Sequence, residues 1–253
     1  MKKIIIISIF VLVAFLVLWG WYNNDPRNIL SDLLKHGGIK QGELVYRISL
    51  FGFIPVGEAV FKEAKEEKLD GRKVYHLSAS AKSLKIVSPF LSGAVNLDSY
   101  IDRESLNPLV FKQGIFVKGK NDLVREASYD QSQGIMTLSG VRRQILPNTQ
   151  DHLSAIFNLR RSDFDKINNY DISINTNQKN YSLKGKAEGG QISLKGKTYK
   201  TVLLKASISR RDKNPYHKST MSMLLLKDEV NLPIMIKVFA SGAVINVKLI
   251  ETR

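Results

Sequence analysis

The chain has 253 residues, of which 43% are hydrophobic, and its formal net charge is +15 at pH 7. It contains no cysteine, which excludes disulfides, thiolate metal sites and lipidation through an N-terminal cysteine. The large positive charge indicates attraction to polyanions of some kind.

An apolar run from Ile4 to Tyr22 follows Lys2 and Lys3 and is interrupted only by one serine and one glycine. As a helix this run spans roughly 28 Å, about the hydrocarbon thickness of a bilayer. The two lysines before it favour a cytoplasmic N-terminus. We therefore expect residues 1–24 to form a single-pass signal-anchor in the inner membrane, with the rest of the chain in the periplasm.

A cleaved secretory signal is the alternative for this N-terminal segment. Such signals have a shorter apolar core and end in small residues that form a cleavage site. The run here ends in "LWGWYNNDPR" and offers no such site. Retention as an anchor is the interpretation that we prefer.

Residues 25–41 are expected to form a short amphipathic helix and a linker. Asp25 suits the N-cap, Pro26 the first helical position and the glycines at 37 and 38 the end of the helix. The apolar residues of this segment share one stripe, which could dock on the chain's own domain, on a partner or on the bilayer. We favour its own domain. The stripe consists of Ile29, Leu30, Leu33 and Leu34.

From Gly42 onward the pattern changes to alternation between apolar and polar residues. Three stretches, "ELVYRISLF", "KVYHLSASA" and "NYSLKGKAE", follow it with turn signals between them. This alternation is typical of antiparallel strands that bury one face. We expect residues 42–253 to form one mainly β domain of roughly ten strands.

Several C-terminal strands are apolar on both faces, as in "TMSMLLLK", "PIMIKVF" and "AVINVKLI". A sheet with one wetted face does not need this, so either a second layer covers it or it curls around an apolar interior. The predicted fold is a single, strongly curved antiparallel sheet, a half-barrel or open barrel, with one internal closing helix.

The stretch "DHLSAIFNLR" at 151–160 carries Asp151, His152 and Ser154, the three residue types of a hydrolase triad. On one helical turn these side chains do not reach the geometry that base, nucleophile and acid require. Its apolar residues recur at helical spacing after a capping aspartate. We therefore expect a capped helix that packs on the sheet.

No other motif assigns a catalytic, metal or cofactor site. The segment "GGQISLKGKT" resembles a phosphate-binding loop, but Gln191 stands where that loop needs a glycine. The four histidines show no metal-ligand spacing. We expect a non-catalytic protein without metal or cofactor, although an enzyme whose residues are not recognisable remains an alternative.

Basic residues are concentrated between 179 and 218, and most of them alternate with apolar residues along strands. They form either a solubilising face or a surface that contacts anionic lipid headgroups or other envelope polyanions. Nucleic acid is not expected as a partner, because the domain is exported and no aromatic side chains interleave the lysines. The residues proposed for anionic contact are Lys184, Lys186, Lys195 and Lys197.

Four stretches resemble a family of bacterial envelope proteins known as domain of unknown function 3108. They are "GELVYRISLFGFIPVGEAVF", "YIDRESLNPLVF", "DHLSAIFNLR" and "LLLKDEVNLPIMIKVFASGAVINVKL". The apolar N-terminal run and the basic segment 179–218 depart from the pattern. The resemblance implies a curved antiparallel sheet similar to the half-barrel of periplasmic lipoprotein carriers, and it implies no catalytic residue.

The leading hypothesis is an inner-membrane-anchored periplasmic module that binds an apolar or lipid-like ligand inside its curved sheet. A core filled by side chains alone is the alternative for the interior. The alternative function is a scaffold of an envelope assembly that docks a partner protein through helix 26–36 or a sheet edge. The expected ligand-lining residues are Ile48, Leu153, Ile156, Phe157, Met223, Leu225, Ile236, Val238, Ile245 and Val247.

Charge reversal of Lys184, Lys186, Lys195 and Lys197 to glutamate should leave folding intact and weaken binding to anionic vesicles, because it removes attraction to the headgroups. Co-sedimentation with vesicles containing anionic lipid measures this. Unchanged binding of the variant would identify these lysines as a solubilising surface.

Overall fold

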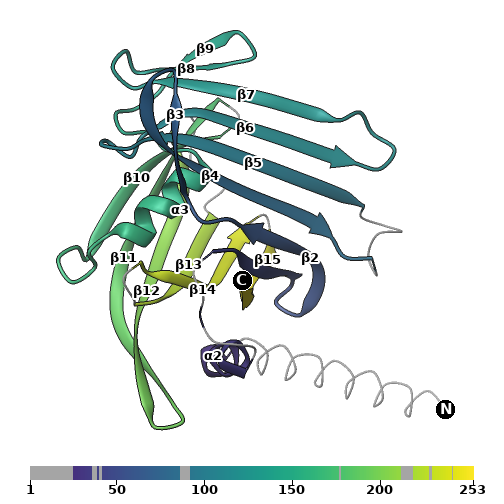
Figure 1. Ribbon diagram of the computed structural model, residues 1–253, viewed down its shortest axis with the longest axis vertical. Coiled ribbons are helices and arrows are strands. Elements are labelled where there is room, and N and C mark those ends of the chain that lie inside the picture. The colour runs from purple at the N-terminus through teal and green to yellow at the C-terminus, as the bar shows by residue number, and fades with distance from the viewer. Residues whose placement is uncertain are drawn as a thin grey trace.

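The computed structural model describes residues 25–35, 39, 42–85, 92–176, 178–211, 219–227, 230–240 and 242–253 (Figure 1). These ranges are mainly β structure with two helices. No helix within them has the length and apolarity needed to cross a membrane. The run from Ile4 to Tyr22, on which the prediction of an anchor depends, lies outside the described residues.

The described strands form a single antiparallel sheet with the order β10-β11-β12-β13-β14-β15-β1-β2-β4-β5-β6-β7-β8-β9, and β3 pairs with β4 beside this path. This sheet has 15 strands among the described residues, more than the roughly ten expected. Strands β3, β8 and β9 have only 5, 4 and 4 residues, too short for alternation to be visible in the sequence. The bounds are α2 (Pro26–Lys35), β1 (Leu44–Leu50), β2 (Ile54–Phe61), β3 (Lys65–Leu69), β4 (Arg72–Ser83), β5 (Gly93–Asp102), β6 (Pro108–Val117), β7 (Leu123–Asp130), β8 (Ile135–Leu138), β9 (Val141–Gln144), α3 (His152–Arg161), β10 (Asn169–Thr176), β11 (Lys179–Leu194), β12 (Lys197–Arg210), β13 (Ser219–Leu226), β14 (Leu232–Ala240) and β15 (Ala243–Thr252).

The sheet bends until its two ends come close together, but no backbone ladder joins β9 to β10. A single backbone bridge between Gln150, after β9, and Ile174 of β10 joins the ends, and side chains add to it. The Gln178 side-chain amide donates to the Leu138 carbonyl oxygen at 3.3 Å, and that of Asn180 donates to the Gln144 carbonyl oxygen at 3.0 Å. The result is a barrel-like sheet that is not closed.

Helix α2 covers the convex face of the sheet. Its residues Ile29 and Leu30 are fully buried, and both belong to a core cluster with Leu224 and Leu226 of β13. Burial lowers the pKa of Lys248 on β15, and the nearby carboxylate of Asp32 on the same helix opposes that shift. The prediction that this helix docks on its own domain is therefore confirmed.

Helix α3 lies inside the curve, between the two halves of the sheet (Figure 1). Leu153 belongs to a core cluster with side chains of β4–β8, whereas Leu159 belongs to a cluster with side chains of β10–β13. One helix thus packs against both walls. Strand β13 is covered on its concave face by α3 and on its convex face by α2, which explains its apolar residues on both sides.

Gly185 of β11 lies at a point of very close approach within the sheet. A Cβ atom at this position would overlap the backbone oxygen of Lys205 on β12 and would lie 2.6 Å from the Tyr170 hydroxyl oxygen. Tyr170 pairs with Gly185 across the β10–β11 ladder. Only a residue without a side chain lets the tyrosine lie over the strand here.

Gly185→Ala should therefore lower the free energy of unfolding by about 2–3 kcal/mol, because the sheet must move to admit the methyl group. Urea unfolding of the full-length chain followed by circular dichroism measures this. Gly189→Ala is the matched control on the same strand, since a Cβ atom there meets nothing within 4 Å. Equal losses for both variants would contradict the close approach at Gly185.

Candidate functional site

A cavity of about 400 Å³ lies between α3 and the first strands of the sheet, and we call it the central cavity. Its size is within the usual range of small-molecule binding sites, 300–1,000 Å³. Most of its lining residues are apolar, but polar atoms contribute almost half of the exposed wall. The apolar lining residues are Ile39, Leu44, Phe61, Ala64, Leu77, Leu153, Ile156, Phe157, Val230 and Leu232, with Tyr75 beside them.

One face of α3 forms a wall of this cavity. Leu153, Ile156, Phe157, Arg160 and Arg161 all line it. They stand at positions i, i+3, i+4, i+7 and i+8, the spacing of residues on one side of a helix. The predicted apolar stripe of three residues therefore continues into two arginines at the end of the helix.

A buried carboxylate fixes the start of α3. Asp151 is the N-cap, and its side chain accepts hydrogen bonds from the backbone N–H groups of Leu153 at 2.7 Å and Ser154 at 2.9 Å. The Ser99 hydroxyl of β5 donates to the same carboxylate at 2.6 Å. Burial raises the pKa of Asp151, and these hydrogen bonds oppose the rise. The bond from Ser99 ties the helix to the wall of β4–β8.

Asn231, between β13 and β14, fixes the other end of α3. Its backbone N–H and side-chain amide donate to the Arg160 carbonyl oxygen at 3.0 and 2.9 Å. The side-chain amide also donates to the Ser162 carbonyl oxygen at 3.0 Å. These bonds satisfy carbonyl groups that a helix end leaves without a partner. The helix is thus held at both ends against opposite walls.

Four charged side chains line the central cavity. The Arg161 guanidinium lies 5.3 Å from the ring centre of Phe157 and 5.8 Å from that of Tyr75, which are cation–π distances. Lys62 and Glu63 come from the segment after β2. Arg160 is the fourth, and its side chain is half-buried.

Of the ten predicted ligand-lining residues, the three on α3 line the central cavity. The seven on strands share one face of the sheet, because the ladders align Met223 with Ile236, Ile236 with Val247 and Val247 with Ile48. Met223, Leu225 and Ile236 pack in the core cluster below α3. Val238 pairs with Ile245 further along the same ladder. None of these seven residues is among those that line the central cavity.

The sequence patterns did not single out the cavity residues contributed by β2 and β4, or either arginine. Arg160 and Arg161 occupy the last turn of a helix, where basic residues commonly balance the helix dipole. Extending the helical stripe from Leu153 by two turns would have placed them on the cavity face. Leu77 and Phe61 were readable only as alternating strand residues.

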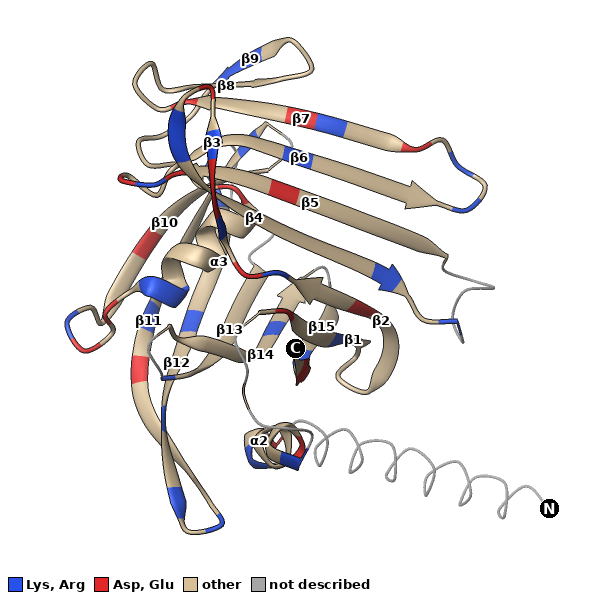
Figure 2. Ribbon diagram, in the orientation of Figure 1, with Lys and Arg blue, Asp and Glu red and all other residues tan. Residues whose placement is uncertain are grey.

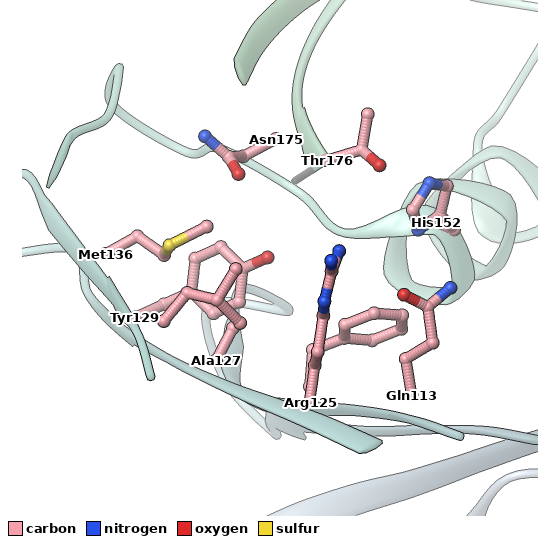
Figure 3. A pocket seen from close by; sticks show the side chains of 10 residues that line it. Gln113, Arg125, Ala127, Tyr129, Met136, His152, Asn175 and Thr176 are labelled. Carbon is pink, nitrogen blue, oxygen red and sulfur yellow. The ribbon is translucent and has the colours of Figure 1, made fainter. Parts of the chain in front are cut away.

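A second cavity, between β6–β8 and the end of β10, is far smaller, at about 20 Å³ (Figure 3). That volume suits about one water molecule. Figure 3 shows the Arg125 guanidinium pointing across it toward the segment that carries Thr176. The Asn175 side chain, 1% exposed, also lines it and donates its amide to the Asn180 side-chain oxygen at 2.8 Å. This cavity is too small for an acyl chain.

The four lysines predicted to contact anionic surfaces are all exposed on the hairpin of β11 and β12 (Figure 2). They form two separate pairs. Lys195 and Lys197 stand at the hairpin tip, whereas Lys184 and Lys186 lie about 30 Å back along β11, at a rise of about 3.3 Å per residue. The structure does not bring the four together in one patch.

Asp151, His152 and Ser154 are not arranged as a catalytic triad. The Ser154 hydroxyl accepts a hydrogen bond from the Asp151 backbone N–H at 2.9 Å, which completes a capping box. The His152 ring instead lies 5.6 Å from the ring of Phe111. Within the described ranges, no group of three metal-ligating side chains is close enough to hold an ion.

The comparisons with known proteins agree with this architecture. A family model described as "Protein of unknown function (DUF3108)" matches residues 45–248. The chain belongs to this family. No curated protein matches.

A beta-barrel-like protein of the domain of unknown function DUF1849 from Brucella abortus has a similar crystal structure, with a TM-score of 0.55 at 10% sequence identity. The match covers 85% of this chain and 98% of that one. At this identity the likeness concerns the fold. A DUF3108 chain and a DUF1849 chain thus share a barrel-like sheet.

Asp151→Ala should lower the free energy of unfolding by about 3 kcal/mol, since it removes the helix cap and leaves the buried Ser99 hydroxyl without its acceptor. Asp151→Asn is the matched control, because its amide oxygen still caps the helix, and it should cost less than about 1 kcal/mol. Urea unfolding of the full-length protein gives both values. A loss for the asparagine variant as large as that for alanine would show that capping is not the role of Asp151.

Proposed function

We propose that this DUF3108 protein is a non-catalytic binding module for an apolar or lipid-like ligand, which the central cavity holds. The observation that carries the proposal is a cavity of about 400 Å³ inside a barrel-like sheet, lined mainly by apolar residues that include the stripe of α3. Burial of a methylene group in such a site contributes about 0.8 kcal/mol. A short acyl chain would therefore bind without any catalytic group.

The proposal includes a location at the periplasmic side of the inner membrane. Its support is the apolar run from Ile4 to Tyr22 and the lysines before it. A module held beside a bilayer has lipid within reach at high local concentration. A binding site for acyl chains is consistent with that position.

A scaffold role has one observation in its favour. All four residues of β9 are exposed, and this strand pairs only with β8 among the described strands. An edge without a second ladder can accept a strand from a partner protein, although the Asn180 side chain already binds the Gln144 carbonyl oxygen at its end. The apolar stripe of α2 cannot serve a partner while its residues are buried in its own domain.

Ile156→Trp should abolish co-purification of lipid, because the larger side chain fills the central cavity from the face of α3. Full-length protein is purified from membranes in amphipathic polymer, extracted with organic solvent and analysed by mass spectrometry. Wild-type protein should carry lipid at close to one molecule per chain. Ile167→Trp, at an exposed position outside the cavity, is the matched control and should keep the lipid.

Two outcomes would overturn the binding role. One is wild-type protein without lipid above the level of an unrelated membrane protein prepared in the same way. The other is equal lipid in Ile156→Trp and wild type. A stoichiometric protein in the same preparation, with no lipid, would favour the scaffold role.

A further inference from the structure

The cavity face of α3 changes character along its length. Leu153 stands at the start of the helix, Ile156 and Phe157 stand in the middle, and Arg160 and Arg161 stand at the end. Arg160 follows Leu153 by seven positions, which places it about 10 Å further along the helix axis. A ligand that lies along this face meets hydrocarbon first and cations last.

Arg160 is a half-buried cation without a carboxylate partner among the described residues. The one hydrogen bond of its guanidinium runs from Nε to the Asn231 carbonyl oxygen at 3.4 Å. Glu63 also lines the cavity and acts on Arg160 electrostatically, but its side chain is exposed and forms no ion pair with it. Burial lowers the pKa of Arg160 from its usual value, yet an arginine stays protonated.

Balancing the helix dipole does not explain this burial. A cation in the last turn interacts with the dipole from a solvated position, and Arg161 is exposed at such a position. Removing a guanidinium from water without a carboxylate at ion-pair distance costs free energy. An anion in the cavity would supply the counter-charge. The anion would need the charges of both arginines, because the C-terminal end of a helix carries partial negative charge and by itself repels an anion.

We infer that the ligand of the central cavity is an amphiphile with a negatively charged headgroup, a carboxylate or a phosphate, which pairs with the guanidinium of Arg160. This inference rests on the proposed function and specifies its ligand. The headgroup lies at the arginine end of α3, with Arg161 and Lys62 beside it. The apolar chain extends along Phe157 toward Leu153 and Leu77.

The test compares two photoactivatable probes with the same acyl chain, a fatty acid and the matching fatty alcohol, each with a diazirine at the end of the chain. Full-length protein in lipid nanodiscs is irradiated with either probe, and the labelled peptides are mapped by mass spectrometry. Labelling is normalised to that of the nanodisc lipid, which removes differences in partition between the probes.

The acid should label the cavity peptides roughly 10- to 100-fold more than the alcohol, the range expected for a charge-assisted hydrogen bond. The label should fall near Leu153 and Leu77, at the far end from the headgroup. Arg160→Gln should remove the preference for the acid while labelling by the alcohol persists. Arg160→Lys should retain part of it, and Arg143→Gln, on exposed strand β9, should leave it unchanged.

An acid-to-alcohol ratio near one in the wild type would overturn the inference, whatever the variants do, and would leave the proposed binding of apolar chains in place. An unchanged preference in Arg160→Gln would also overturn it. If neither probe labels the cavity peptides, the proposed function fails as well.

Discussion

The constraint behind this fold is that strands β12–β15 carry apolar side chains on both faces. Each face must be removed from water, and a single sheet cannot do this alone. Helix α2 covers the convex face, where Ile29 and Leu30 are fully buried. The concave face is covered by the curvature of the sheet and by α3, which packs on both walls. The two helices are therefore structural requirements of the sheet.

The position of α3 decides what kind of interior remains. Ser99 holds its first turn against one wall through Asp151, and Asn231 holds its last turn against the loop between β13 and β14. A helix held in this way fills the space over β10–β13, where Leu159 is buried. It leaves the space over β1, β2 and β4 unfilled, and that space is the central cavity. The interior is thus part packed core and part binding site.

The sequence predicted a mainly β domain, the two-sided burial of its C-terminal strands and both helices, because periodicity and capping residues are local signals. Which part of the interior is packed core and which part is cavity could not be predicted from the sequence, because it depends on the register of the strands. Ile48, Val247, Ile236 and Met223 share one face across four strands, which only the ladders reveal, and none of the four lines the central cavity. Arg160 could not be predicted as a cavity residue for another reason. A basic residue in a last helical turn has an ordinary role, and only its burial in a cavity wall distinguishes it.

The incomplete closure of the sheet makes this arrangement possible. A barrel of about sixteen strands joined by a full ladder encloses a water-filled lumen. Here the ends of the sheet are joined by one backbone bridge, between Gln150 and Ile174, and by the side chains of Gln178 and Asn180, so no continuous ladder imposes the tilt and stagger that closure demands. It can fold in against a single helix. The size of the cavity therefore follows from where α3 crosses the interior. Although the described sheet has many strands, the space that α3 leaves is no larger than a site for one small ligand.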